Sequence, residues 1–401
     1  MIPGVLLALA VCLCLYTYAG YPAIVKLLSV GRRAPHAGSA PEASLPPPPP
    51  RISVTLPVYN EAAVIAATLE RILAVDYPVD RRQILVVSDA STDGTDEIVA
   101  RFADRGVALL RLPRRQGKTA AENAARHHLT GEIVINTDAS VRIHPDAFKH
   151  LVAAFADRSV GVASGRDVSV TNVHEQANRA NSGEATYTGY EMWIRDLETA
   201  VGGIVGASGC LYAIRADLHM LPVPEGLSRD FAAALTAREH GLRAVSVAEA
   251  VCYVPRAASL RQEYRRKVRT ITRGISTLAH KRALLNPFRY GAFAWMLFSH
   301  KVCRWLVPWA LLLFVAALGT LALTSGWARA LLGAVAVPGA LAGIAWFWPE
   351  GQGMPRLLAL PAFVAVGNIA VLHAWLRVLA GRSAPVWEPT RRGPLPSNVA
   401  R

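Results

Sequence analysis

Long apolar stretches near both ends of the chain set the strongest limit on how it folds. No charged side chain occurs between Met1 and Val25, and the chain is again almost continuously apolar from about residue 305 to Leu379. Both stretches contain windows of roughly the 20 apolar residues that cross a bilayer as a helix. About 250 residues of ordinary globular composition lie between them. The sequence therefore predicts a soluble domain held between membrane helices.

The first of these stretches, residues 1–30, is predicted to be an uncleaved transmembrane helix rather than a signal peptide. It has no basic leader, and its apolar part is longer than the roughly 7–15 residues of a secretory core. Lys26, Arg32 and Arg33 follow it, so the positive-inside rule places the soluble domain in the cytoplasm. The five cysteines show neither a disulfide framework nor a zinc spacing, which suits a reducing compartment. We expect a multi-pass protein of the cytoplasmic membrane.

The C-terminal part is predicted to return to the membrane. Residues 286–304 mix aromatic and basic side chains, which is typical of an interfacial amphipathic helix. About three transmembrane helices are expected within residues 305–380, followed by a tail at 381–401. With one helix before the domain and three after it, the tail would lie outside, yet its arginines favour the inside. Either one helix is re-entrant or the tail is exported.

Between these parts, residues 31–50 form a Pro-rich linker and residues 51–285 the soluble domain. The domain opens with "RISVTLPVYNE", in which Ile52, Val54 and Leu56 alternate with polar residues as in a strand. Helix-like and strand-like segments then alternate as far as "EIVINTDAS". This alternation predicts βαβ units, an α/β fold and a mostly parallel sheet.

Carboxylates gather at the predicted strand ends, although the chain has a net charge of +14. Three predicted strands end at Asn60–Glu61, at Asp89 and at Asp138. Ligands bind beyond the carboxyl ends of strands in such sheets. Buried carboxylates need partners, so we expect a cation or hydrogen-bond donors beside them. The following "STDGTDE" is interpreted mainly as a capped helix start.

Four motifs in order carry a resemblance to a known family. They are "LPVYNE" at Leu56–Glu61, "VVSDASTDGT" at Val86–Thr95, "GKTAAEN" at Gly117–Asn123 and "NTDAS" at Asn136–Ser140. Over about residues 50–280 the chain resembles the family 2 glycosyltransferases. More closely, it resembles their membrane-embedded branch, which includes the hyaluronan, chitin, cellulose and poly-N-acetylglucosamine synthases. The resemblance implies a nucleotide-sugar-binding domain of the GT-A type, flanked by one N-terminal and about three C-terminal transmembrane helices.

The resemblance also implies roles on the donor side. Pro57, Glu61 and Asp89 would line the nucleoside pocket, and Lys118 suits contact with nucleotide phosphate. Asp138 stands where the family's Asp-X-Asp motif begins, which would hold Mg²⁺ or Mn²⁺ against the diphosphate. In this chain the second acid of that motif is replaced by Ser140.

On the acceptor side, "YEMWIRDLETAVGGIVGASGCLYAIR" at Tyr190–Arg215 resembles the segment that shapes the acceptor end of the pocket. Asp230 stands where the family has its catalytic base, which takes the proton from an acceptor hydroxyl. The family's usual preceding acid is Arg229 here. A helix cap is the alternative role for Asp230.

The last predicted cytoplasmic helix matches most of the signature Gln-X-X-Arg-Trp. The resemblance implies that Gln262 and Arg265 hold the diphosphate, and Arg266 is a third candidate for nucleotide-sugar binding. Arg266 replaces the Trp that stacks on a growing sugar chain in the family, which argues against processive synthesis. A cationic stripe is predicted at Arg261, Arg265, Arg269 and Arg273. Attraction to anionic lipid is the alternative role for its outer members.

These observations predict an inverting, metal-dependent glycosyltransferase. A sugar would pass from a nucleoside diphosphate donor, most simply a UDP-sugar, to a lipid-linked acceptor or a growing polysaccharide. Inversion follows from a single displacement, because no enzymic nucleophile is evident. The alternatives are a polyprenyl-phosphate sugar synthase and a non-catalytic nucleotide-sugar-binding membrane protein. Membrane lipids and a separate export subunit are the expected partners, and nucleic acid is not among them.

Overall fold

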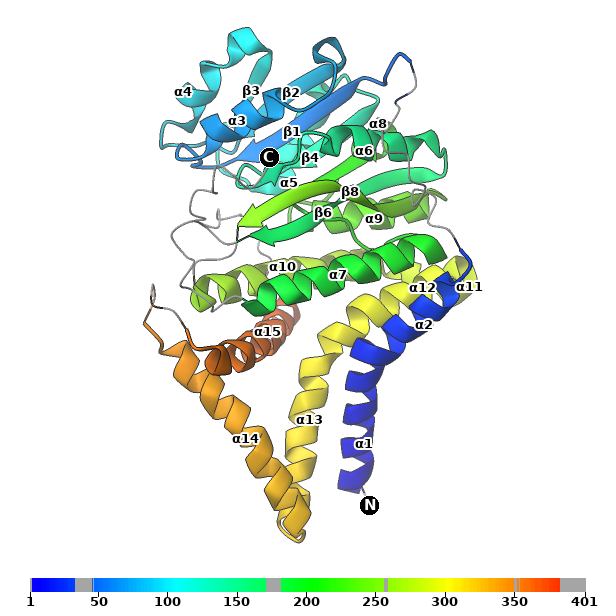
Figure 1. Ribbon diagram of the computed structural model, residues 1–401, viewed down its shortest axis with the longest axis vertical. Coiled ribbons are helices and arrows are strands. Elements are labelled where there is room, and N and C mark those ends of the chain that lie inside the picture. Colours follow the sequence, from blue (N-terminus) through cyan, green and yellow to red (C-terminus); the bar gives the residue numbers. More distant parts are fainter. Residues whose placement is uncertain are drawn as a thin grey trace.

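The computed structural model describes residues 2–32, 45, 47–170, 182–255, 259–349, 352 and 354–382. A domain with one large sheet lies at one end, a layer of helices lies beside it, and a group of long apolar helices extends away (Figure 1). Most of the predicted linker at 31–50, and all but the first two residues of the tail at 381–401, fall outside the described residues.

The sheet has eight strands in the order β3-β2-β1-β4-β7-β6-β8-β5. Their bounds are β1 Ile52–Val58, β2 Arg82–Ser88, β3 Val107–Arg111, β4 Ile133–Thr137, β5 Arg142–Ile143, β6 Val160–Val170, β7 Leu211–Arg215 and β8 Arg243–Pro255. Strands β1 to β4 pair in parallel, whereas β7 runs antiparallel to both β4 and β6. The predicted α/β fold with a mostly parallel sheet is confirmed.

Burial explains why the first half folds as predicted. All seven residues of β1 are buried, because helices cover both faces of a central parallel strand. Leu56, Ile65 and Phe148 are fully buried in the main core. The helices of this half are α3 Ile65–Leu73, α4 Thr95–Ala100, α5 Lys118–Ala125 and α6 Ala147–Ala153, with short turns at Val79–Arg81, Ala103–Arg105, Arg126–His128 and Ala154–Ala156.

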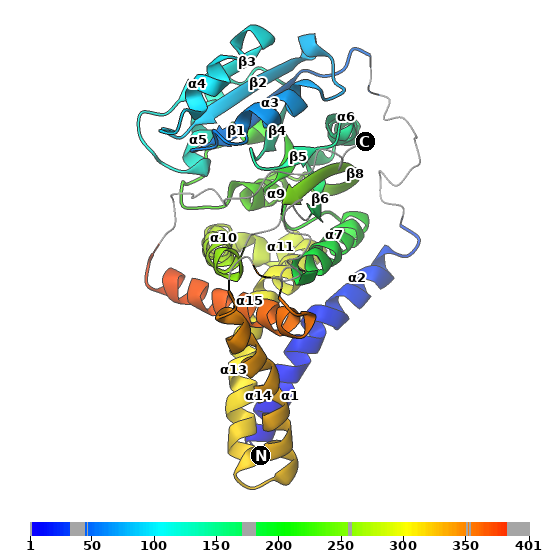
Figure 2. The same cartoon turned by 60° about the vertical axis from the view of Figure 1, so that its left-hand side comes forward.

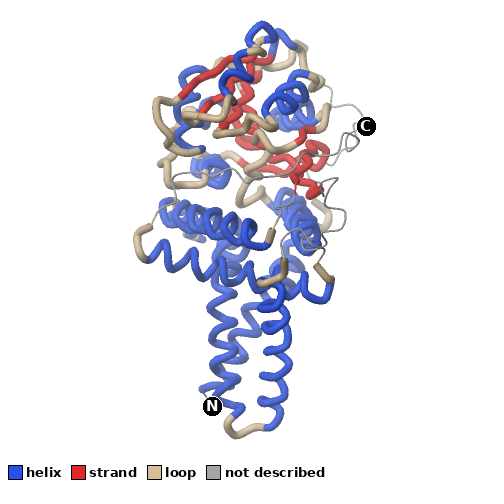
Figure 3. The backbone as a smooth tube through the Cα atoms, turned by 90° about the vertical axis from the view of Figure 1, so that its left-hand side faces the viewer, coloured by secondary structure: helices blue, strands red, loops and turns tan. Residues whose placement is uncertain are grey.

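A layer of helices separates the sheet from the apolar helices (Figures 1 and 3). It contains α7 Ser182–Val201 and α10 Leu260–His280. The shorter helices α8 Ala216–His219 and α9 Arg229–Glu239 lie closer to the sheet. Tyr212 and Ala234 belong to one buried cluster, which fixes α9 beneath β7.

Among the described residues, four helices are long and apolar enough to cross a membrane. One is N-terminal and three are C-terminal, which is the number that the sequence predicts. They are Ile2–Ser29, which joins α1 Ile2–Leu15, the π-helical turn Tyr16–Gly20 and α2 Tyr21–Ser29; Ala292–Ala322; α14 Gly326–Trp346; and α15 Arg356–Leu379. The helices α1, α13 (Arg304–Ala322) and α14 extend away from the domain, whereas α15 lies across them (Figures 1 and 2). Along its length α15 packs against α10.

The segment predicted as a separate interfacial helix, residues 286–304, divides differently. A turn at Arg282–Leu285 and α11 Pro287–Tyr290 come first, and the chain breaks at Gly291, whose φ is 52°. From there α12 Ala292–Leu297, a π-helical turn at Phe298–Cys303 and α13 Arg304–Ala322 form one continuous rod. No Gly or Pro interrupts residues 292–304, so nothing ends the helix at the predicted boundary.

Candidate active site

One cavity of about 410 Å³ brings together residues from both halves of the domain. It lies where β4 ends, between α5, α9 and α10. Five of the predicted site residues line it: Lys118, Asp138, Ser140, Asp230 and Arg266. Its volume is within the roughly 300–1,000 Å³ typical of small-ligand sites. We refer to it as the donor cavity.

Asp138 and Lys118 form an ion pair inside this cavity. Nζ of Lys118 lies 2.5 Å from Oδ1 of Asp138 and donates a second hydrogen bond, 3.1 Å long, to the carbonyl oxygen of Gly209. Burial lowers the pKa of Lys118, but the carboxylates of Asp138 and Glu122 outweigh burial and leave that pKa raised. Lys118 is therefore positively charged inside this cavity, which suits contact with a phosphate group.

The oxygen ligands in this cavity fit a divalent metal ion that binds together with a nucleotide. Asp138, Ser140 and Asp167 supply oxygen atoms to the same cavity. Among the described residues, no three His, Cys, Asp or Glu side chains cluster closely enough to hold a metal alone. Mg²⁺ is commonly held by one or two carboxylates together with substrate phosphates. The cavity matches that pattern rather than a cage built from protein ligands only.

Asp230 lies in the first turn of α9 and is not its cap, because Ser228 holds the cap position. Oγ of Ser228 donates to Oδ1 of Asp230 over 2.6 Å. The other oxygen, Oδ2, faces the Gly-rich turn, where a Cβ on Gly209 would lie only 2.8 Å away. Gly209 thus lets the chain pass between Asp230 and the Asp138–Lys118 pair.

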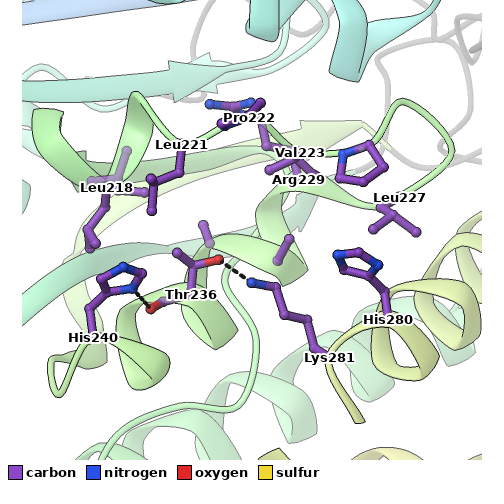
Figure 4. Close-up of a pocket in the computed structure, with 14 residues that line it drawn as sticks. Leu218, Leu221, Pro222, Val223, Leu227, Arg229, Thr236, His240, His280 and Lys281 are labelled. Carbon is purple, nitrogen blue, oxygen red and sulfur yellow. Dashed lines mark hydrogen bonds between the residues drawn. The ribbon is translucent and has the colours of Figure 1, made fainter. Parts of the chain in front are cut away.

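The side chain of Arg229, which precedes Asp230, holds three helices together. Its guanidinium donates to Oδ1 of Asn123 over 2.6 Å and to the carbonyl oxygen of His219 over 2.7 Å, which ties α9 to α5 and α8. It also lines a small separate pocket, in which Lys281 donates a hydrogen bond to Thr236 (Figure 4). That pocket measures about 90 Å³, too small for a nucleotide-sugar.

The three residues predicted to hold the nucleoside do not line the donor cavity. Pro57 is buried in β1, and the backbone of Glu61 is held by Oγ1 of Thr95. Asp89 is 1% exposed, and its two oxygens accept from the backbone N–H groups of Gln116 and Gly117 at 2.7 and 2.8 Å. Asp89 therefore fixes the turn that precedes Lys118. Nucleoside contact by these residues stays a prediction.

The acidic run after β2 leads into a helix as predicted, because α4 begins at Thr95, but its N-cap is Gly94, which makes no side-chain cap hydrogen bond. Its carboxylates also tie two loops together. Asp93 accepts from the backbone N–H groups of Ala62 and Thr95 at 3.0 and 3.1 Å. Asp96 pairs with Arg111 at the edge of the sheet. These carboxylates hold the loop after β1 against the start of α4 and stay outside the donor cavity.

On α10, the arginines that line the donor cavity are Arg266, Arg269 and Arg273. Arg265 is exposed, and Gln262 lies in the first turn, where its N–H bonds Oγ of Ser259. A helix has 3.6 residues per turn, so a spacing of four drifts by about 40° per step. The predicted stripe therefore rotates away from the cavity toward its N-terminal end.

Glu122, which the sequence motifs did not single out, also lines the donor cavity. It is 1% exposed, and neither of its carboxylate oxygens has a hydrogen-bond partner among the described residues. Burial raises its pKa. Its position four residues after Lys118 in "GKTAAEN" puts both side chains on one face of α5, and this spacing could have revealed it.

A second group that was overlooked lies on the membrane side of α7. Glu191 and Glu198 are seven residues apart, so they share a helix face. His300 bridges them: its Nε2 lies 2.8 Å from Glu191 and its Nδ1 lies 2.6 Å from Glu198. Arg304 pairs with Glu191 over 2.5 Å. We call these four residues, with Lys301, the interfacial charge cluster.

Comparison with known proteins identifies the domain. Residues 53–213 match the family described as "Glycosyl transferase family 2". This region is a family 2 glycosyltransferase domain. A solved mannosyltransferase from Pyrobaculum calidifontis, in complex with GDP-Man and Mn²⁺, has a similar fold, with a TM-score of 0.70 and 25% identity over 94% of this chain and 100% of that chain.

Curated relatives of this family 2 domain are similar over shorter stretches. A beta-monoglucosyldiacylglycerol synthase from Nostoc sp. is 30% identical over 159 residues, which cover 39% of this chain and 33% of that protein. An undecaprenyl-phosphate 4-deoxy-4-formamido-L-arabinose transferase from Edwardsiella ictaluri is 35% identical over 115 residues, which cover 28% and 35%. The chain thus matches about a third of the length of these relatives.

Proposed function

We propose that this chain is an inverting membrane glycosyltransferase that moves a sugar from a nucleoside diphosphate donor to a hydroxyl of a lipid-linked acceptor. One observation carries the proposal. Asp230, oriented by Ser228, faces the same cavity as the Asp138–Lys118 pair. A candidate base and a candidate diphosphate site therefore lie on opposite sides of a single glycine turn.

In the proposed reaction, Oδ2 of Asp230 accepts the proton of the acceptor hydroxyl as that oxygen attacks the anomeric carbon. Lys118 and the arginines of α10 hold the departing diphosphate. Asp138 and Ser140 would hold Mg²⁺ or Mn²⁺, which when bound supplies positive charge against the diphosphate oxygens. A single displacement inverts the anomeric configuration.

Our proposal for the class of acceptor starts from Arg266, which replaces the Trp of the processive signature. The stacking Trp of the processive signature is absent, so we propose single transfers rather than synthesis of a long polymer. The names of both curated relatives contain a lipid, diacylglycerol or undecaprenyl phosphate, which supports a lipid acceptor. The proposal places the domain on the cytoplasmic face of the cytoplasmic membrane and leaves export to a separate subunit.

A second candidate, a polyprenyl-phosphate sugar synthase, is favoured by the undecaprenyl-phosphate relative. There the attacking group would be a phosphate oxygen, which carries its own negative charge and needs no base. The two candidates therefore differ in their dependence on Asp230.

The test uses detergent-purified protein with a panel of UDP- and GDP-sugars, Mg²⁺ or Mn²⁺, and a membrane lipid extract. We expect transfer from one donor, and a fall of about 10²–10⁴-fold in Asp230→Asn. Asp217→Asn, which neutralises an exposed carboxylate on α8, is the matched control and should keep full activity. Transfer that survives in Asp230→Asn would support the synthase. Donor binding without any turnover would support a non-catalytic protein.

A further inference from the structure

A second cavity, of about 500 Å³, lies next to the donor cavity on its membrane side. Its walls come from α7, α10, α13 and α15, which meet below the sheet domain (Figures 1 and 2). Tyr187 and Glu191 line both cavities, so the two spaces adjoin through one pair of side chains. We call this second space the interfacial cavity.

One part of its wall is cationic. Lys267, His300, Lys301 and Arg304 line it, and Glu191 is the only carboxylate among its described lining residues. Glu191 already serves three of these groups, with His300, Arg304 and Lys301 at 2.8, 2.5 and 3.8 Å. Burial would raise the pKa of Glu191, but the charges of His300 and Arg304 outweigh it and hold this pKa well below its usual range.

Lys267 is paired with Glu263 at 3.5 Å, but the hydrogen-bonding capacity of Arg304 is not fully used among the described residues. The side chain of Arg304 is 9% exposed, and among the described residues its Nε and Nη2 have no hydrogen-bond partner. A buried guanidinium with two unused donors is costly unless an acceptor is supplied. Phosphate oxygens match the planar fork of an arginine and accept strongly from it.

Most of the remaining wall is apolar, with Asn368 as a polar exception. Trp305 and Leu311 come from α13, and Phe363, Val364 and Val371 come from α15. Both helices are among the candidate spans, and His300, Lys301 and Arg304 lie in the N-terminal half of the span that contains α13, Ala292–Ala322. A cavity with a cationic part beside a larger apolar part has the polarity of an anionic lipid.

We propose that the interfacial cavity binds the phosphate headgroup of the lipid acceptor. The phosphate lies against Lys301 and Arg304, the hydrocarbon chain follows α13 and α15, and the group to be glycosylated passes Tyr187 and Glu191 toward Asp230. That the bound lipid is the acceptor rests on the proposed function, but the binding of the lipid can be measured without turnover. It divides lipid acceptors into a favoured anionic class and a disfavoured neutral class.

The test measures lipid retention. The full chain is reconstituted in phosphatidylcholine vesicles that contain a small fraction of either phosphatidic acid or diacylglycerol with the same acyl chains, then extracted and examined by native mass spectrometry. We expect phosphatidic acid to be retained over diacylglycerol. In Lys301→Gln, retention should weaken about tenfold, the usual effect of losing one charge-assisted contact. Lys149→Gln, which removes a lysine of the surface of α6, should behave as wild type.

Lys267→Gln provides a second variant on another helix, should Lys301→Gln fail to fold. Equal retention of the two lipids, or unchanged retention in both cavity variants, would overturn the proposal. Displacement of phosphatidic acid by inorganic phosphate would also overturn it, because it would show an anion site that gains nothing from the hydrocarbon chain. If the protein transfers no sugar, the lipid result still stands by itself, so the two proposals fail separately.

Once a donor is known, kinetics add a readout that a merely structural role would not give. With a phosphorylated lipid acceptor, Lys301→Gln should raise the KM for the acceptor about tenfold while the KM for the donor changes by less than about twofold. An equal rise in both would mean a general disturbance of the domain and would contradict the assignment.

Discussion

Two parts of the domain stabilise their carboxylates in different ways. On the side that we propose for the nucleotide, called the nucleotide side, Asp89 and Asp93 accept hydrogen bonds from backbone N–H groups of neighbouring loops; Asp89 reaches Gly117, 28 residues away. On the membrane side, Glu198 and Glu191 bind His300 and Arg304, which are 102 and 113 residues away. One side uses neutral backbone donors of neighbouring loops, and the other uses side chains from a helix distant in the sequence.

The difference matters for what each side tolerates. A backbone N–H keeps its position when a carboxylate is neutralised, so the loss is limited to one or two hydrogen bonds. A buried cation that loses its carboxylate stays buried and unpaired, which costs more. The nucleotide side should therefore lose function before stability, and the interfacial charge cluster should lose stability first.

The largest effect on stability is expected for Glu198→Ala. Glu198 is fully buried, and its removal leaves His300 and the hydroxyl of Tyr21 without their shared acceptor. Breaking a buried ion pair typically costs about 3–5 kcal/mol. The midpoint of thermal unfolding in detergent should fall sharply, whereas Glu70→Ala, at an exposed ion pair, should leave it unchanged. A similar midpoint in both variants would remove the proposed contrast.

The next effect is expected at the turn where the two sides meet. In Gly209→Ala, the new Cβ would lie 2.8 Å from Oδ2 of Asp230 and displace the carboxylate. Misplacement of a reacting group by about 1 Å can cost roughly 100-fold in rate. Transfer should fall by about that factor with a small change in melting temperature. Gly202→Ala is the control, because its Cβ would meet only Met296 at 3.9 Å.

A smaller loss is expected for Asp89→Asn. The amide keeps one acceptor oxygen, but its NH₂ group faces one of the N–H groups of Gln116 and Gly117. The loss should be about 1–3 kcal/mol, with a higher KM for the donor because the turn before Lys118 loosens. Chemical denaturation and donor kinetics measure both quantities. A larger loss of stability than in Glu198→Ala would reverse the comparison.

The smallest effect has the opposite sign. The folded-state pKa of Glu122 is raised above its ordinary 4.5, so the folded state gives up this proton less readily than the unfolded state. The stability linked to Glu122 is therefore full below about pH 4.5 and is lost as the pH rises through the folded pKa. Glu122→Gln should melt higher than wild type at about pH 8, and the gap should close toward pH 4.5. A constant gap would mean that its charge is irrelevant.

Local pattern predicts the first half of the sheet well. Strands β1 to β4 follow from runs of apolar residues, and Asp89 and Asp138 follow two of them as polar residues at strand ends. The ion pair of Asp138 with Lys118 was not predicted, because Lys118 begins a helix rather than ending a strand. The nucleoside role of Asp89 was harder to judge, because a carboxylate that binds a loop and one that binds a ligand look alike in sequence. Only the hydrogen bonds to Gln116 and Gly117 show its structural part.

Long-range arrangement was less predictable. The rotation of Arg265 away from the donor cavity depends on how α10 packs, and a spacing of four residues alone did not show that Arg269 and Arg273 are the members of the stripe that line it. The interfacial charge cluster joins α7 to residues about a hundred positions later, so no local signal marks it. The spacing of Glu191 and Glu198 shows that they share a helix face, but it does not show which residues pack against that face.

The position of α15 decides the sidedness of the chain. By composition it is a candidate span, yet it packs along α10, and its Trp375 donates to the carbonyl oxygen of Trp305 over 2.9 Å. If α15 stays on the side of the domain, as we propose, the polypeptide crosses the bilayer three times, through α1, α13 and α14. Residues 2 and 382 would then face opposite compartments, and Arg382 would lie on the cytoplasmic side that its charge prefers. A reporter fused after residue 382 would share its compartment with the sugar donor.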